Sequence, residues 1–209
     1  LGKIYYKGHL ITQNISKAIY YFTLSAKNNH KKAQFVLGFI FYEGHYIKRD
    51  IRMSIHYFTL SSNQNDTKAQ FCLGLIYYEG YYIKRDISKA IHYFTLSANK
   101  NDSKAQFYLG IIYYKVQYVT KNIKKAIKYF TLSSNQNNAY AQYNLGIIYY
   151  QGLSITKDIN KSIHYLSLAS NQNIPEAQFN LGVIYYENQL FKEAIHYYKL
   201  AANHNYPEA

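Results

Sequence analysis

Several residue types are scarce in this sequence, and their scarcity narrows the possible functions. Its 209 residues include one cysteine, one methionine, two prolines and no tryptophan. A single cysteine, Cys72, can form neither a disulfide within the chain nor a cysteine-based zinc site, and it favours a reducing compartment. We therefore expect a cytoplasmic protein.

Acidic residues are also scarce. The chain has 11 aspartates and glutamates against 24 lysines and arginines, which gives a formal net charge of +13 at pH 7. Such an excess is typical of proteins that bind nucleic acid, anionic membranes or acidic protein surfaces. A second explanation stays open, because abundant lysine, asparagine, isoleucine and tyrosine are also what A/T-rich codons produce.

Long apolar runs are missing as well. None approaches the roughly 18 residues that suggest a membrane span, and the start lacks the basic, apolar, small-residue order of a secretory signal. Hydrophobic residues nevertheless make up 48% of the chain, which is enough for a continuous core. We expect a globular protein without a membrane span.

The chain is built as a repeat. The dipeptide Leu-Gly recurs every 36 residues, at Leu1-Gly2, Leu37-Gly38, Leu73-Gly74, Leu109-Gly110, Leu145-Gly146 and Leu181-Gly182. A block this short can bury its apolar face only against copies of itself. We divide the chain into one array of repeats 1 to 6, at residues 1–30, 31–66, 67–102, 103–138, 139–174 and 175–206, with the start of a further unit at 207–209. Both ends resemble cuts through a longer array.

Each repeat contains two stripes of apolar residues at helical spacing. In repeat 3 the stripes predict a first helix, helix A, over residues 67–78 and a second, helix B, over about 87–99. Asp86 stands directly before helix B, where a side-chain oxygen caps the first turn. The same slot holds Asn14, Asp50, Asn122 and Asp158. The array is therefore predicted to be all-α.

Two further signals mark where these helices end and cross. An asparagine follows every helix B, and asparagine tolerates the left-handed backbone that ends helices: Asn29, Asn65, Asn101, Asn137, Asn173 and Asn205. Glycine inside helix A costs about 1 kcal/mol, so its recurrence indicates a close approach between helices. We expect its counterparts to be the small residues Ala18, Ser54, Ala90, Ala126, Ser162 and Ala194.

The pattern resembles the Sel-one-like repeat, a relative of the tetratricopeptide repeat. The matching landmarks are Ala-Gln-Phe-x-Leu-Gly-x-Ile-Tyr-Tyr-x-Gly, a loop ending in Asp, and Lys-Ala-Ile-x-Tyr-Phe, seen most fully from Ala69 to Phe94. The usual helix B tryptophan is replaced by Tyr57, Tyr93, Tyr129 or Tyr165. The resemblance implies a right-handed α-solenoid of antiparallel helix pairs that scaffolds protein complexes, in some relatives as an array attached to a kinase.

A second stripe on helix A is the first candidate for a binding surface. The resemblance places it on the concave side of the superhelix, where it would bind a partner peptide or helix. Its members are Phe35, Phe39, Tyr42, Phe71, Leu75, Tyr78, Phe107, Ile111, Tyr114, Tyr143, Ile147, Tyr150 and Tyr186. Packing between repeats is the competing interpretation and is favoured for the phenylalanines and aliphatic residues. Among the tyrosines, Tyr78 and Tyr114 are expected to contact the ligand.

A row of basic residues before each helix B cap supports the alternative function. Lys48, Arg49, Lys84, Arg85, Lys121 and Lys157 would line one edge of the stack, and Lys32, Lys68 and Lys104 would form a second row. Such rows, interleaved with tyrosines, suit a nucleic-acid backbone or another acidic surface. Ordinary solvated loop charges are the competing interpretation.

Nothing in the sequence points to catalysis. The acidic residues fall into caps, turns and loop edges, and no catalytic triad, paired carboxylates or phosphate-binding loop stands out. Histidines at one helix B position, His56, His92, His164 and His196, recur too far apart, about 10 Å, to share a metal ion. We expect a protein-binding scaffold that is not an enzyme and has no cofactor, metal site or catalytic residue.

Overall fold

The computed structural model describes residues 1–8, 12–115, 122–152, 155–204 and 206, and every regular element in that part of the chain is an α-helix. The chain divides into two compact units, residues 1–101 and 102–209. The first contains α1 (Gly2–Lys7), α2 (Ile15–Lys27), α3 (Lys31–Glu43), α4 (Ile51–Asn63), α5 (Thr67–Glu79) and α6 (Ile87–Ala98). The second contains α7 (Ser103–Tyr114), α8 (Ile123–Ser134), α9 (Ala139–Gln151), α10 (Ile159–Ser170), α11 (Pro175–Glu187) and α12 (Phe191–Asn203).

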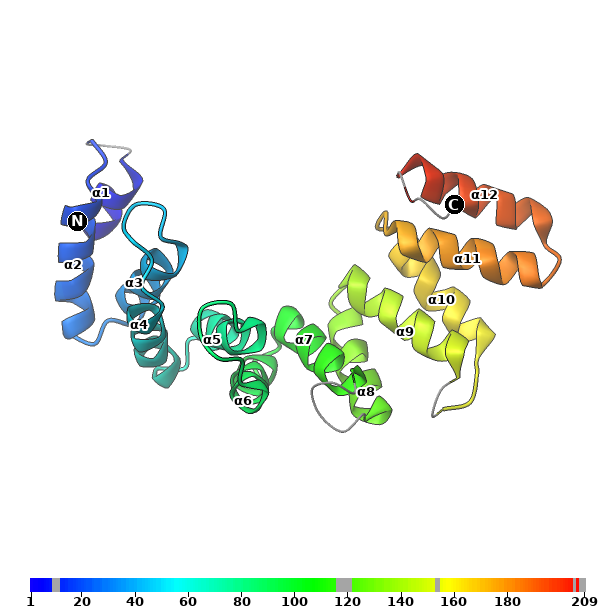
Figure 1. The fold of residues 1–209 in the computed structure, drawn as a ribbon, viewed down its shortest axis with the longest axis horizontal. Coiled ribbons are helices and arrows are strands. Elements are labelled where there is room, and N and C mark those ends of the chain that lie inside the picture. Colours follow the sequence, from blue (N-terminus) through cyan, green and yellow to red (C-terminus); the bar gives the residue numbers. More distant parts are fainter. Residues whose placement is uncertain (9–11, 116–121, 153–154, 205, 207–209) are drawn as a thin grey trace. The chain divides into compact units, whose positions relative to one another are not determined.

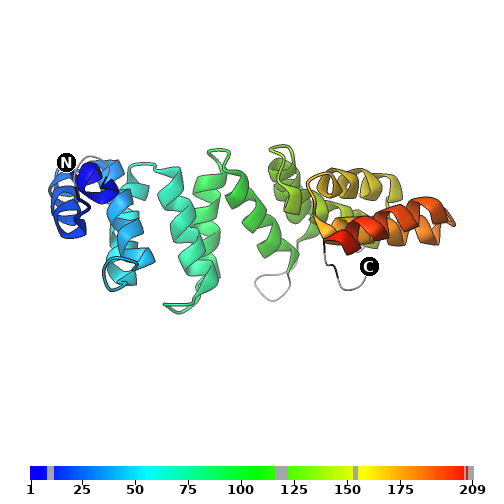
Figure 2. The same ribbon diagram turned by 90° about the horizontal axis from the view of Figure 1, so that it is seen from above.

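Consecutive helices pack as pairs within each unit (Figures 1 and 2). In repeat 2, Lys31 at the start of α3 accepts a hydrogen bond from Ser61 near the end of α4, and Phe41 near the end of α3 stacks on Tyr57 in the middle of α4. Contacts that run in opposite directions along the two helices make the pair antiparallel. Each helix B also packs on the next helix A of its unit. The predicted all-α solenoid of helix pairs is confirmed.

The signals that mark the helix ends are also confirmed. Asp86 is the N-cap of α6, and its carboxylate accepts a hydrogen bond from the backbone N–H of Lys89 at 2.9 Å. That hydrogen bond is the main reason why the pKa of Asp86 lies below its ordinary value. The asparagines after helix B have φ between 57° and 63°, which is the left-handed region: Asn29, Asn65, Asn101, Asn137 and Asn173. Asn205, predicted to do the same, lies outside the described residues.

The helix A glycine lies against a large side chain of helix B. A Cβ atom added to Gly74 would stand 2.5 Å from Cδ1 of Phe94, whose ring is fully buried. The same distance is 2.6 Å from Gly38 to Phe58 and 2.5 Å from Gly110 to Phe130. The predicted small residue is also present at the crossing, since Ser162 Oγ donates a hydrogen bond to the Gly146 carbonyl at 2.9 Å. The close approach was therefore predicted correctly, but the ring that occupies it was not.

A pair of parallel aromatic rings joins the two helices of each repeat. The ring centroids lie 5.4 to 5.9 Å apart and the planes are 4° to 7° from parallel. The pairs are Tyr5–Tyr21, Phe41–Tyr57, Tyr77–Tyr93, Tyr113–Tyr129, Tyr149–Tyr165 and Tyr185–Tyr197. Tyrosine at the helix B position where the family usually has tryptophan thus retains an aromatic contact with helix A.

A buried glutamine of helix A accepts a hydrogen bond from a glutamine just after helix B of the same repeat. Gln34 in α3 is 2% exposed, and its Oε1 accepts a hydrogen bond from Gln64 Nε2 at 2.7 Å. The same bond joins Gln136 to Gln106 and Gln172 to Gln142. A buried amide oxygen needs such a donor, because leaving it without one costs free energy.

Repeat 3 lacks this donor. Lys100 stands where repeats 2, 4 and 5 have a glutamine, and its ammonium group donates to Asn65 instead. Gln70 Oε1 is consequently buried without a hydrogen-bond partner. Gln178 Oε1 in repeat 6 is buried without a hydrogen-bond partner as well.

We expect Gly74→Ala to lower the free energy of unfolding by about 2 kcal/mol. The added methyl group overlaps the fully buried Phe94 ring, and overpacking of this kind outweighs the better helix propensity of alanine. Urea unfolding monitored by circular dichroism measures the change. Ser88→Ala, at an exposed position of α6, is the control and should change stability by less than about 0.5 kcal/mol. A Gly74→Ala protein as stable as its control would contradict the close approach.

We expect Lys100→Gln to raise the free energy of unfolding by about 1 kcal/mol, because the new amide can donate to the buried Gln70 Oε1. Lys124→Gln removes the same charge from an exposed position on α8 and controls for the loss of a lysine. Thermal unfolding of both proteins measures the difference. Equal melting temperatures would show that the glutamine contact contributes nothing.

Candidate functional site

The predicted second stripe of helix A divides into three positions with different roles. At the first position, phenylalanine packs against the ring of helix B in its own repeat. The ring centroids are 5.7 Å apart for Phe35 and Phe58, 5.8 Å for Phe71 and Phe94, and 6.0 Å for Phe107 and Phe130. These phenylalanines therefore contribute to packing. Tyr143, at the same position of α9, packs against the core that includes Leu166 and Leu181.

At the third position, a tyrosine connects helix A to the next repeat. The Tyr114 hydroxyl donates to Gln151 Oε1 at 3.1 Å, and the Tyr150 hydroxyl lies 2.9 Å from both carboxylate oxygens of Glu187. Each partner lies 37 residues further along the chain. Helical periodicity did not predict this contact, although the tyrosine and its acid or amide partner lie 37 residues apart in both cases.

The same contact shifts the ionisation of its partners. Burial raises the pKa of Tyr42, and the nearby Glu79 carboxylate raises it further. Burial also raises the pKa of Glu79, and the hydrogen bond from Tyr42 partly opposes that rise. Burial is the first cause of the raised pKa of Tyr114 and of Tyr150 as well. These phenols stay protonated at neutral pH and act as hydrogen-bond donors.

At the second position the burial varies between repeats, and Ile111 and Ile147 also pack against the hydrophobic core. Phe39 in α3 is 37% exposed, and Leu75, Ile111 and Ile147 are half-buried at the equivalent positions of α5, α7 and α9. In repeat 6 the most exposed member of the stripe is Tyr186, which is 59% exposed and contacts Phe191 edge to face. We call the second position together with the residues one and two turns before it the helix A face. Its unit 1 residues are Lys32, Val36 and Phe39 of α3 and Lys68, Cys72 and Leu75 of α5.

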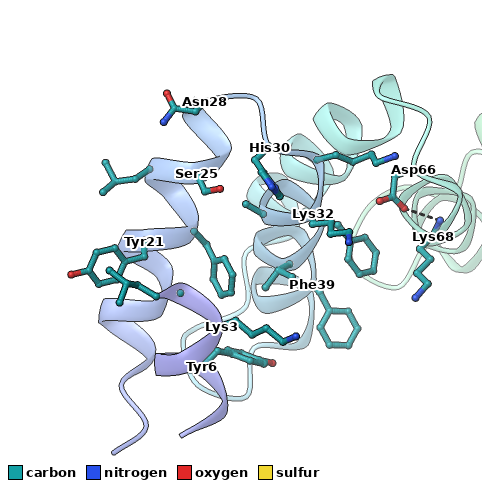
Figure 3. A pocket seen from close by; sticks show the side chains of 18 of the residues that line it. Lys3, Tyr6, Tyr21, Ser25, Asn28, His30, Lys32, Phe39, Asp66 and Lys68 are labelled. Carbon is teal, nitrogen blue, oxygen red and sulfur yellow. Dashed lines mark hydrogen bonds between the residues drawn. The ribbon is translucent and has the colours of Figure 1, made fainter. Parts of the chain in front are cut away.

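An open groove of about 1170 Å³ borders this face in the first unit. Figure 3 shows Lys3, Lys32 and Phe39 on the side of the groove formed by α1 and α3, and Lys68 next to Asp66 at the start of α5. Lys7 and Lys31 line the groove too, and Asp66 is its one acidic side chain. Asp66 is already used as the N-cap of α5, where it accepts hydrogen bonds from two backbone N–H groups.

The other half of the groove arises from the length of α1. This helix has 6 residues, whereas α3 has 13. Phe22 and Ser25 of α2 line the groove, but their counterparts Phe58 and Ser61 are buried beneath α3. Only the half around Lys32, Phe39 and Lys68 is therefore a surface of the kind that later repeats also present.

The predicted basic edge is used partly for loop closure. Arg49 donates from Nε to the Tyr42 carbonyl at 2.7 Å and from Nη2 to the Glu43 carbonyl at 3.0 Å. These carbonyls belong to the last turn of α3, where they have no partner within the helix. The guanidinium group also lies over the Tyr82 ring, 4.5 Å from its centroid, and donates to the Tyr82 hydroxyl.

Other members of the basic edge differ in their surroundings. Arg85 donates to the Glu79 carbonyl at 3.2 Å, and Lys157 lies over the Tyr150 ring at 4.7 Å. Lys48 and Lys84 extend into solvent. Lys121 lies outside the described residues. Binding of nucleic acid along this edge stays a prediction, with at least three of its cations already engaged in their own repeats.

Two other kinds of feature are absent from the described residues. Within the part of the chain that the structure describes, no three histidine, cysteine, aspartate or glutamate side chains come together in a way that could hold a metal ion. No described helix combines the length and the apolar character that crossing a membrane requires.

Comparison with known proteins identifies the family. The Sel1 repeat model matches six times, at residues 1–30, 31–66, 67–102, 103–138, 139–174 and 175–206. The chain belongs to the Sel1 repeat family. Its members are generally non-catalytic scaffolds for protein interactions. A search of curated proteins found no match to the sequence.

Solved structures of Sel1 repeat proteins have the same fold. A protective antigen of uropathogenic Escherichia coli superposes with a TM-score of 0.91 at 24% identity over 98% of this chain, which spans 45% of the length of that protein. A Sel1 repeat protein from Oxalobacter formigenes superposes with a TM-score of 0.76 at 28% identity, over 97% of this chain and 84% of that one.

We expect Arg49→Leu to lower the free energy of unfolding by about 1 kcal/mol, because it removes the hydrogen bonds that cap α3. Lys48→Leu, one residue earlier, removes the same charge from a side chain that extends into solvent and should be nearly neutral. Urea unfolding of the two proteins distinguishes a structural arginine from a merely solvated one. Equal stability would leave Arg49 without a structural role.

Proposed function

We propose that the chain is a non-enzymatic scaffold that binds a segment of a partner protein on the helix A face. One observation carries the proposal. The first position of the helix A stripe packs within the repeat and the third bonds to the next repeat, whereas at the second position Phe39 is 37% exposed and Leu75, Ile111 and Ile147 are half-buried. Apolar side chains that recur at one surface position are suited to an extended peptide or an amphipathic helix.

The parts of this surface on α3 and α5 are held by rigid packing. Phe39 stacks on Phe35, whose ring is itself held against Phe58, and α3 and α5 are each anchored by a buried helix A glycine. A binding surface held in place in this way loses little conformational entropy when a partner binds. Tyr78 and Tyr114 border the same face, and their contact with a ligand remains part of the proposal.

We expect the wild-type protein to enrich binders from a displayed library of random peptides of about 12 residues. The doubly substituted Phe39→Ser, Leu75→Ser protein should lose most of that enrichment, because it removes the apolar contacts of two adjacent repeats. The control is Tyr20→Ser with Leu132→Ser, which changes exposed residues on helices α2 and α8. Circular dichroism establishes that all three proteins are folded. Equal enrichment by both double variants would exclude the helix A face as the binding site.

A further inference from the structure

The charge on the helix A face points to the chemistry of its partner. Lys32 is in the first turn of α3 and Lys68 in the first turn of α5, and both side chains are exposed. Neither helix has an acidic residue in its first turn. A helix N-terminus carries partial positive charge, so lysine there is unfavourable for folding and adds to an existing positive potential. The helix dipole therefore does not account for these two lysines.

A further lysine on the α3 side of the groove strengthens this potential. Lys31 lines the same groove, and none of Lys31, Lys32 and Lys68 forms an ion pair with a carboxylate in the described residues. The one acid of the lining, Asp66, is occupied as an N-cap. The groove thus combines more lysines than carboxylates with an apolar floor at Phe35, Val36 and Phe39.

The charge at the equivalent position changes along the sequence. Repeats 2, 3 and 4 have Lys32, Lys68 and Lys104, repeat 5 has Tyr140, and repeat 6 has Glu176 in the first turn of α11. Lysine thus occupies this position in three consecutive repeats and is absent from it in the last two. The positive helix A face is therefore a property of the first unit and of the helix that follows it.

We propose that the helix A face of unit 1 binds an acidic protein segment that also carries aliphatic or aromatic residues, an inference that rests on the proposed function. Carboxylates of the segment pair with Lys32 and Lys68, and its apolar side chains lie on Phe39 and Leu75. The apolar floor favours a protein over a nucleic acid, since Phe39 is stacked on Phe35 and offers one ring rather than a series of platforms for bases. Charge and apolar contacts are both required.

Four labelled probes test the inference by fluorescence anisotropy with the whole chain. They are a peptide of about 12 residues that alternates glutamate with leucine or phenylalanine, its counterpart with lysine for glutamate, its counterpart with serine for every apolar residue, and an oligo(dT) of about 12 nucleotides. We expect measurable binding of the first probe alone, weakening as salt rises from about 50 to about 300 mM.

The substitutions Lys32→Glu and Lys68→Glu together should raise the dissociation constant of the first probe by about tenfold. They should not impair folding, because glutamate in the first turn suits the helix dipole. Lys124→Glu with Lys192→Glu changes the same net charge on α8 and α12 and should alter binding by less than about twofold. Phe39→Ala should also weaken binding, whereas Leu132→Ala, at a residue of similar exposure, should not.

Each other outcome overturns the inference. Equal binding of the lysine peptide shows that charge does not select the partner, and equal binding of the serine peptide or oligo(dT) shows that the surface recognises polyanions in general. Equal weakening by both lysine double variants shows that only net charge matters. If no probe binds while the displayed library still yields peptides that depend on Phe39 and Leu75, the proposed function stands and the acidic partner is wrong. If the library also yields none, both are wrong.

Discussion

The contact between the helix A glycine and a large helix B side chain sets the geometry of every repeat. At Gly74 a single additional carbon would lie 2.5 Å from the fully buried ring of Phe94. The absence of a side chain lets the two helices approach closely, and this approach brings the parallel aromatic pair Tyr77–Tyr93 into contact. Because each repeat packs on the next, a constant distance within the pair gives a constant surface for stacking.

The regularity of the sequence made the fold predictable. A 36-residue period, a cap before helix B and an asparagine after it together determine where the helices begin and end, and the structure agrees to within about one residue at both ends of α5 and α6. Two features could not be derived in this way. The buried hydrogen bond between Gln64 and Gln34 joins residues that are 30 apart in the sequence. Gln189, in the loop between α11 and α12, has a positive φ although it is neither asparagine nor glycine.

The candidate site was predictable only as a set of residues, not as a set of roles. One apolar stripe in the sequence contains residues that pack within the repeat, such as Phe71, residues that bond to the next repeat, such as Tyr150, and residues that remain partly in solvent, such as Phe39. Helical periodicity places them on one side of helix A but cannot tell which neighbour covers each one. That distinction depends on the angle at which the next repeat packs. For the same reason Arg49 was interpreted as an edge charge, whereas it caps α3.

A double-mutant cycle between Gly74 and Phe94 tests the central constraint most directly, with urea unfolding as the measurement. If the ring is what excludes a side chain at Gly74, alanine there should destabilise the wild-type protein but should stabilise the Phe94→Ala protein by up to about 1 kcal/mol, because alanine has the higher helix propensity. If Gly74→Ala costs the same free energy in both backgrounds, the glycine is not there to accommodate the ring, and the account of how the repeats are held together is wrong.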